Sequence, residues 1–322
     1  MISKQKEKKM GMSFDDKYAD AIKRFKAVGM PDYPRYQLDY YADFVELLTL
    51  FSGKDGISRG DIQDQFFGEP DEKTDAEKKD KDESFLKEIF SRIDERISLY
   101  TDSYPYEKKS DSDVLCLKAN VTDNEKYYLF LLFASQLDIF NSFNADLTTD
   151  FETLSFESLK SYLPNNAIIK QFGKNTEYQG NAVSKIKALS KDIGFPLNNY
   201  AISQIGEHNN QERGLDVIGW IPFKDKCQNK VVVLGQCACG KKYEYKQIET
   251  PRFASYFELY TTKPLHSLFI PYSLINVREN KFYGDEIKAL VFERKRIVSL
   301  LQGNEIYERL LSKQLVEKCI NS

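Results

Sequence analysis

The segment from Glu207 to Lys242 decides the fold: it reads EHNNQERGLDVIGW (207–220), then a short polar connection, then VVVLGQCACGKK (231–242). The β-branched and aromatic residues in both parts are typical of buried strands. We therefore expect two neighbouring strands joined by a turn, with Asp216 at the start of the first and Gln236 at the end of the second. A carboxylate among apolar residues costs free energy unless something pairs with it. A metal ion is one such partner.

The composition of this 322-residue chain is that of a globular protein with room for two domains. Hydrophobic residues make up 41% of it, and the net charge of −3 argues against a broad basic face that coats nucleic acid. A local basic groove stays open. The five cysteines lack the spacing of a disulfide framework, which predicts a cytoplasmic protein. No run approaches the roughly 18 apolar residues of a membrane helix, so we expect no membrane partner.

The first half of the chain, residues 1–164, is predicted to be an α-helical module. Apolar residues recur there with the period of a helix. The predicted helices cover residues 13–26, 37–51, 85–100, 125–140 and 151–163. The mixed-sign charge run at 68–84 is expected to be a solvated loop or the polar entrance to the next helix. No motif in this half implies chemistry, so we expect it to regulate the second half or to bind a partner.

The second half of the chain, residues 165–322, alternates between helix and strand patterns. We expect a helix at 182–193, a short strand at 200–205, the strand pair that carries Asp216 and Gln236, and a closing helix at 304–319. Alternation of this kind predicts an α/β domain with a central mixed sheet.

A helix followed by a strand that starts with an acid, and by a second strand that ends in Gln236, resembles the core of the PD-(D/E)XK nuclease superfamily. The chain is most similar to prokaryotic restriction-type and antiviral-defence nucleases, and some branches of the superfamily carry Gln in place of the second acid. The resemblance covers roughly residues 170–300. It implies a restriction-endonuclease-like mixed sheet flanked by helices. It also implies hydrolysis of DNA phosphodiesters with Mg²⁺ or Mn²⁺.

The resemblance gives roles to individual residues of this chain. Asp216 would be the bridging metal ligand, and Gln236 a second oxygen ligand through its side-chain carbonyl. Glu207 or Glu212 would add a ligand from the connection before Asp216. Phosphodiester hydrolysis needs such a hard cation, because the cation activates water and neutralises charge on the phosphoryl oxygens.

The sequence departs from the family pattern two positions after Gln236. A lysine there would share the face of Gln236 by strand alternation and would orient the attacking water, but the residue is Ala238. Lys241 and Lys242 follow, and they are the candidates to replace it. The expected helix at 182–193 contains no glutamate, although related enzymes often have one there.

Basic residues on either side of the strand pair are the predicted contacts to the DNA backbone. They are Arg213, Arg294, Lys295 and Arg296. The alternative for the last three is a solvated helix entrance paired with Glu293.

One hypothesis for the cysteines that follow Gln236 is a zinc site, whose ligands would be Cys237, Cys239, Cys227 and His208. Structural zinc normally takes paired cysteines two to four residues apart, whereas one residue separates Cys237 from Cys239. We therefore expect buried free thiols on the face opposite Gln236.

These features together predict a cytoplasmic, divalent-metal-dependent DNA endonuclease of a prokaryotic antiviral defence or restriction system. Other subunits of a defence complex are expected partners, because an acidic protein is consistent with a complex in which another subunit delivers the DNA. Homo-oligomer formation is a further possibility. The alternative is a catalytically degenerate nuclease-like subunit that binds DNA or scaffolds a defence complex. The missing lysine at Ala238 favours that alternative. A zinc-bearing interaction protein is a third hypothesis.

Overall fold

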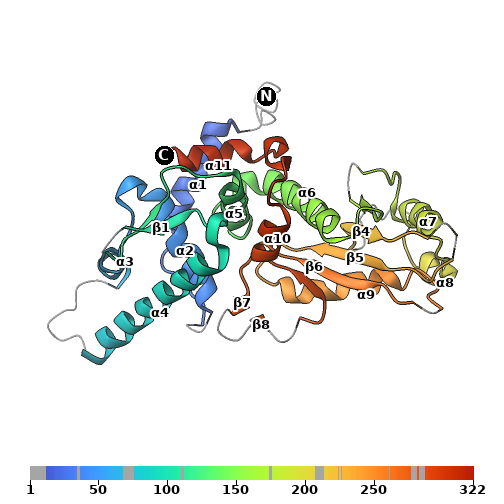
Figure 1. Cartoon of the computed structure of the whole chain (residues 1–322), viewed down its shortest axis with the longest axis horizontal. Helices are drawn as coiled ribbons and strands as arrows, with labels where there is room; N and C mark the ends of the chain where they lie inside the picture. The colour runs from blue at the N-terminus through green and yellow to red at the C-terminus, as the bar shows by residue number, and fades with distance from the viewer. Residues whose placement is uncertain are drawn as a thin grey trace, which may run out of the picture.

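The computed structural model of the chain describes residues 12–34, 37–67, 76–109, 112–173, 176–206, 214–223, 225, 227–260, 262–276, 281–282 and 287–322. Helices of the first half gather on one side of the molecule, and a sheet with flanking helices lies on the other (Figure 1). Within these ranges, no helix is long and apolar enough to cross a membrane.

The first half is mainly helical, as the sequence predicts. Its described α-helices are α1 (Phe14–Ala27), α2 (Leu38–Phe51), α3 (Arg59–Phe66), α4 (Ala76–Tyr100), α5 (Asp123–Ala134) and α6 (Asn144–Tyr162). A short antiparallel pair, β1 (Tyr106–Lys108) and β2 (Leu115–Leu117), lies between α4 and α5. The charge run is helical from Ala76 onward, so part of it forms the first turns of α4.

Helix α5 is the most deeply buried helix of the first half. It starts with a capping box, in which the hydroxyl of Thr122 accepts from the N–H of Glu125 and the Glu125 carboxylate accepts from the N–H of Thr122. Every residue from Tyr127 to Ala134 is buried. A helix that is apolar all round belongs inside a core. It ends at Ala134 rather than at the predicted residue 140, and the hydroxyl of Ser135 donates to the carbonyl of Leu132 over 2.7 Å.

The second half contains the mixed sheet that was expected. Its strands are β3 (Ile168–Gln171), β4 (Val217–Trp220), β5 (Val232–Cys237), β6 (Leu265–Phe269) and β9 (Leu290–Phe292), in the spatial order β3-β4-β5-β6-β9. The pairs β3–β4 and β4–β5 are antiparallel, whereas β5–β6 and β6–β9 are parallel. A separate antiparallel pair is formed by β7 (Ile275–Asn276) and β8 (Lys281–Phe282).

The second half also has five α-helices within the described ranges. They are α7 (Ala182–Ile193), α8 (Asn199–Ser203), α9 (Glu249–Ala254), α10 (Arg294–Leu300) and α11 (Lys313–Ile320). Helix α7 has the predicted bounds, because the side chain of Asn181 caps its start and Gly194, with φ +71°, ends it in the left-handed region.

Two predicted elements of the second half are wrong. Residues 199–203 form helix α8 instead of a strand, because the side-chain oxygen of Asn198 accepts from the N–H of Ala201 over 3.1 Å and caps a helical turn. The closing helix begins at Lys313 rather than at residue 304. The carboxylate of Asp150 holds the chain before it, since it accepts from the N–H of Ser312 over 2.7 Å.

Different helices cover the two faces of the sheet (Figure 1). Val217, Val233 and Phe269 pack into one core with the helices of the first half and with α10 and α11. Ile218 and Leu234 point to the other face, where they pack with α7 and α9. Alternate residues of a strand face opposite sides, which explains this division. The expected boundary at residue 164 therefore marks a change of secondary structure, but the core is continuous across it.

Candidate functional site

Asp216 and Gln236 lie side by side at adjacent strand ends. Asp216 directly precedes β4, and the pairing of Val217 with Gly235 places it opposite Gln236. The side-chain Nε2 of Gln236 donates to Oδ2 of Asp216 over 2.5 Å, and the N–H of Cys237 donates to the same oxygen over 2.6 Å. Two donors of β5 therefore orient this carboxylate.

The other end of the Gln236 amide, Oε1, is buried and has no hydrogen-bond partner within the described part of the chain. The residue is 8% exposed. An unsatisfied buried acceptor costs about 1–3 kcal/mol. An oxygen-seeking cation would supply a partner for Oε1.

The backbone before Asp216 is shaped by Gly214, whose φ of +83° lies in the region that favours glycine. A Cβ at this position would collide with the side chain of Glu249, the first residue of α9. Glu249 thus lies against the chain two residues before Asp216, and it forms an ion pair with Arg252. The residue pattern does not reveal Glu249 as a neighbour of this strand end, because only the packing of α9 brings it there.

A further acid approaches from α6, which packs against β3, β4 and β5. Oε2 of Glu152 lies 3.5 Å from the position that a Cβ of Gly173 would take, just beyond the end of β3. Burial raises the pKa of the Cys237 thiol, and the charges of Asp216 and Glu152 raise it further. Both carboxylates therefore act on the same thiol. Glu152 is thus an acid of α6 that lies close to the end of β3.

The predicted metal ligands are only partly within the described ranges. Glu207, Glu212 and the predicted DNA contact Arg213 lie outside them. Among the residues that are described, no group of three or more His, Cys, Asp or Glu side chains is arranged to hold a metal ion. Asp216 and Gln236 offer a carboxylate and an unpartnered amide oxygen. This donor chemistry fits Mg²⁺ or Mn²⁺, because Mg²⁺ commonly takes one or two protein carboxylates and completes its shell with water and phosphate oxygens.

The two lysines proposed to replace the missing one do not reach the pair. Lys241 forms an ion pair with Asp138 at 3.2 Å, and its Nζ lies 5.3 Å from the centre of the Tyr33 ring. Lys242 is exposed. Neither forms a hydrogen bond or ion pair with Asp216 or Gln236 in the described structure. The contacts in the described structure thus give no support to the predicted catalytic roles of Lys241 and Lys242, which stay predictions.

Arg294 cannot contact DNA, contrary to the prediction, because it is completely buried. Its Nη1 and Nη2 bind Oδ1 and Oδ2 of Asp43 over 2.8 and 2.9 Å, and its Nε donates to the carbonyl of Pro271 over 2.8 Å. Asp43 belongs to α2, so this arginine ties α10 to the first half of the chain.

Arg294 is one member of a buried ionic cluster, which comprises Asp39, Asp43, Glu46, Arg96 and Arg294. The hydroxyls of Tyr104 and Tyr128 donate to Glu46 over 2.8 and 2.9 Å. Although burial opposes it, the two guanidinium groups hold the pKa of Asp43 below its usual range. Burial raises the pKa of Asp39 and Glu46, so the two guanidinium groups offset the three carboxylates only in part. We assign this cluster a structural role.

Lys295 and Arg296 remain accessible, since Lys295 is half-buried and Arg296 is exposed. Both line a cavity beside β9. They are the predicted nucleic-acid contacts that the structure leaves at the surface.

Cys237 and Cys239 are free thiols. Both are partly buried and pack against the core that contains α6. Gln236 and Leu234 face the other side of the sheet. Burial raises the pKa of Cys239, and Glu152 and Asp216 raise it further. These thiols therefore stay protonated near neutral pH.

We expect a thiol reagent such as DTNB to modify Cys227 rapidly and Cys237 and Cys239 slowly at about pH 8, because the thiolate is the reactive form. Cys227 is exposed, whereas burial and two carboxylates disfavour the thiolate of the other two. Peptide mass spectrometry after a short exposure would identify the modified residue. Modification of Cys239 as fast as Cys227 would contradict this assignment.

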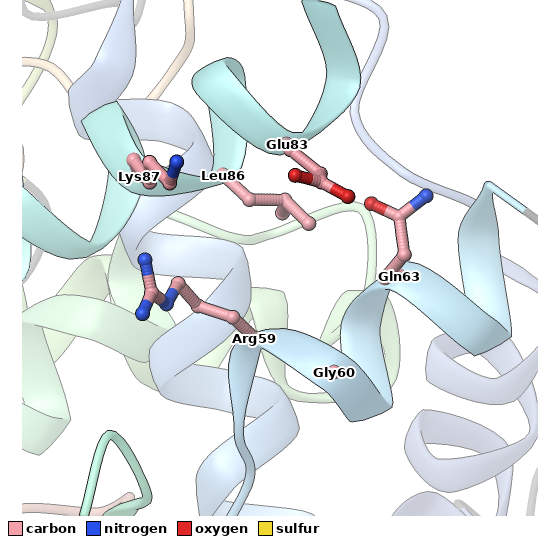
Figure 2. Close-up of a pocket in the computed structure, with 6 residues that line it drawn as sticks. All are labelled: Arg59, Gly60, Gln63, Glu83, Leu86 and Lys87. Atoms are coloured by element: carbon pink, nitrogen blue, oxygen red, sulfur yellow. The ribbon is translucent and has the colours of Figure 1, made fainter. Parts of the chain in front are cut away.

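A separate cavity of about 290 Å³ lies between α3 and α4. In Figure 2, Arg59 and Lys87 lie on one side of it, and the carboxylate of Glu83 faces the amide of Gln63 on the other. Arg59 also pairs with Asp113. Two cations and two acids thus meet here, so the cavity has no excess charge with which to select a ligand.

The fold and site define an α/β protein whose mixed sheet carries an acid–amide pair at adjacent strand ends. No protein-family model matches the chain, and searches of curated proteins and of solved structures found no match. Functional assignment therefore depends on the residues and their geometry.

Proposed function

We propose that this chain is a divalent-metal-dependent DNA endonuclease of a prokaryotic antiviral defence or restriction system. The observation that carries the proposal is the pair Asp216–Gln236, whose amide oxygen Oε1 is buried without a partner in the described part of the chain. The mixed sheet flanked by helices is the architecture that the nuclease resemblance implies, and it supports the same assignment.

In this proposal the protein orients the ligands before the metal binds. Asp216 and Gln236 would hold Mg²⁺ or Mn²⁺, which supplies charge neutralisation at the phosphoryl oxygens and activation of water. The N–H of Cys237 fixes the Asp216 carboxylate over 2.6 Å.

The test is cleavage of plasmid DNA in the presence of Mg²⁺ or Mn²⁺. We expect the wild type to nick or linearise the plasmid, and EDTA or Asp216→Ala to abolish this, because the carboxylate is the charged ligand of the pair. Asp138→Asn is the matched control, since Asp138 is an exposed acid that pairs with Lys241 at 3.2 Å. Cleavage that persists in a folded Asp216→Ala variant contradicts the assignment of this site.

A second candidate is a nuclease-like subunit that binds DNA or scaffolds a defence complex without cleaving DNA. Two observations favour it. Ala238 stands in an apolar cluster with Leu268 and Ile270 where the nuclease pattern has lysine, and Lys241 is engaged by Asp138. Retention of intact plasmid in a gel-shift assay, without cleavage in either metal, would support this candidate over the first.

A further inference from the structure

A cavity of about 400 Å³ lies against β9, an edge strand of the sheet. Its walls include Tyr162, Leu290, Phe292, Lys295, Arg296 and Leu300. They come from the end of α6, from the edge strand and from α10. The volume lies within the range of small-ligand sites, about 300–1,000 Å³.

The aromatic wall of the cavity is held in place and partly open. The Tyr162 ring packs edge-on against Phe292, with ring centroids 5.2 Å apart, and Phe292 stacks on Phe269 at 4.4 Å. Tyr162 nevertheless remains 50% exposed. A positioned, half-exposed aromatic ring is the kind of surface on which a nucleobase stacks.

Lys295 brings cationic charge to the lining of the same cavity. Lys295 forms no ion pair with any residue that the structure describes, and its Nζ lies 5.7 Å from the centre of the Tyr100 ring. The neighbouring Glu293 is completely buried and accepts from the N–H of Arg296 over 2.9 Å. Burial lowers the pKa of Lys295, and the nearby charge of Glu293 opposes this shift.

Arg296 adds donors to the same lining. Its Nη1 donates to the carbonyl of Val291 over 2.7 Å, which anchors the guanidinium beside the edge strand. A guanidinium carries five N–H donors in a planar fork that suits phosphate oxygens. The cavity thus combines an aromatic ring with two cations, and this combination matches a base and its phosphate.

The cavity lies at the same end of the sheet as the candidate active site. Gln236 pairs with Leu268, and Leu268 pairs with Val291, which lines the cavity. Neighbouring strands lie about 4.8 Å apart, so the backbones of Gln236 and Val291 are about 10 Å apart. Phe292 pairs with Phe269 on the face covered by helices of the first half, whereas Gln236 shares the other face with Leu234.

We infer that this cavity is a nucleotide subsite, in which a base stacks on Tyr162 and its phosphate binds Lys295 and Arg296. The choice of a nucleic acid as the ligand rests on the proposed function. The cavity, its aromatic ring and its cations are observed independently of that proposal. A local subsite of this kind lets a chain with net charge −3 hold a nucleic-acid strand without a broad basic face.

The test is binding of fluorescein-labelled oligothymidylate in EDTA, so that cleavage cannot occur, followed by fluorescence anisotropy over a series of salt concentrations. Tyr162→Ala is expected to weaken binding about five-fold or more, the lower bound for loss of one stacked base. Tyr162→Leu, which keeps apolar packing on Phe292, is expected to show a similar loss. Lys295→Gln is expected to reduce the slope of log Kd against log salt concentration by about 0.7, the value for one phosphate contact on a single strand.

The matched control is Lys126→Gln. Lys126 also lies over a tyrosine ring, 5.2 Å from the centre of Tyr307, but it pairs with Asp123 at 2.9 Å and does not line this cavity. We expect this variant to bind like the wild type. Oligodeoxyuridylate and oligouridylate, which differ only in the sugar, serve as further probes, and the one that binds more tightly identifies the sugar that the subsite prefers.

Absence of oligonucleotide binding by the wild type would overturn the inference, as would unchanged affinity and salt slope in the folded Tyr162 and Lys295 variants. Its failure is distinct from failure of the proposed function. If the variants lose binding but the wild type cleaves no DNA, the subsite stands and the nuclease proposal fails. If only Asp216→Ala loses cleavage and the cavity variants bind and cleave normally, the nuclease stands and the subsite fails.

Discussion

Replacement of Arg294 by methionine is expected to lower the free energy of unfolding by about 3–5 kcal/mol. The Arg294 guanidinium is completely buried, and it binds both carboxylate oxygens of Asp43 as well as the carbonyl of Pro271. Methionine restores apolar volume but leaves a buried carboxylate with only part of its compensation. Removal of one member of a buried ion pair is costly because the other charge stays in a medium that solvates it poorly.

Urea-induced unfolding, followed by the fluorescence of Trp220, measures this effect. Trp220 is the only tryptophan of the chain and is buried in β4, so its emission reports on the sheet. The control is Arg309→Met, because Arg309 is exposed and a change there is expected to stay within about 0.5 kcal/mol. Equal stabilities of the two variants would show that the ionic cluster does not join α10 to α2 energetically.

Gln236→Glu is expected to lower the free energy of unfolding by about 2–4 kcal/mol near pH 8 in the absence of divalent metal. The Nε2 group that donates to Asp216 over 2.5 Å would be replaced by a second carboxylate oxygen, so two negative charges would face each other at the strand ends. A bound cation would neutralise both. We therefore expect Mg²⁺ to restore most of the lost stability, and to do so more strongly than in the wild type.

The pH dependence follows from the same contact. The introduced carboxyl has its pKa raised by the neighbouring Asp216 charge, so its protonated form donates to Asp216 as the amide does. The variant should approach wild-type stability below about pH 4, near the unfolded pKa of glutamate, and lose stability as the pH rises through the raised pKa of the folded state. Gln236→Met, which adds no charge, should show neither the pH dependence nor the recovery with Mg²⁺. Absence of that recovery in Gln236→Glu would contradict the metal site.

The bounds of several elements could be predicted because their signals lie within a few residues of sequence. Asn181 and Gly194 cap helix α7, and the predicted and observed bounds agree. The helical period places α1 and α2 within one or two residues. The pair Asp216–Gln236 was also predictable, because β4 and β5 follow each other along the chain and their pairing brings the two residues together.

The other features of the fold and the site depend on contacts between segments that are distant in sequence. The basic run at Arg294 resembles a surface patch, and Arg294 is buried only because Asp43, 251 positions away, offers both of its carboxylate oxygens. Glu152 and Glu249 likewise reach the strand ends of β3 and β4 only through the packing of α6 and α9.

Caps, helical periods and strand alternation depend on neighbours along the chain, so the residue pattern determined α7, the mixed sheet and the acid–amide pair. The burial of a charge depends on whether a partner of opposite charge arrives from elsewhere, since an unpaired charge is too costly to bury. Only the tertiary structure therefore decided that Arg294 belongs to the ionic cluster and that Lys295 and Arg296 remain at a cavity beside β9.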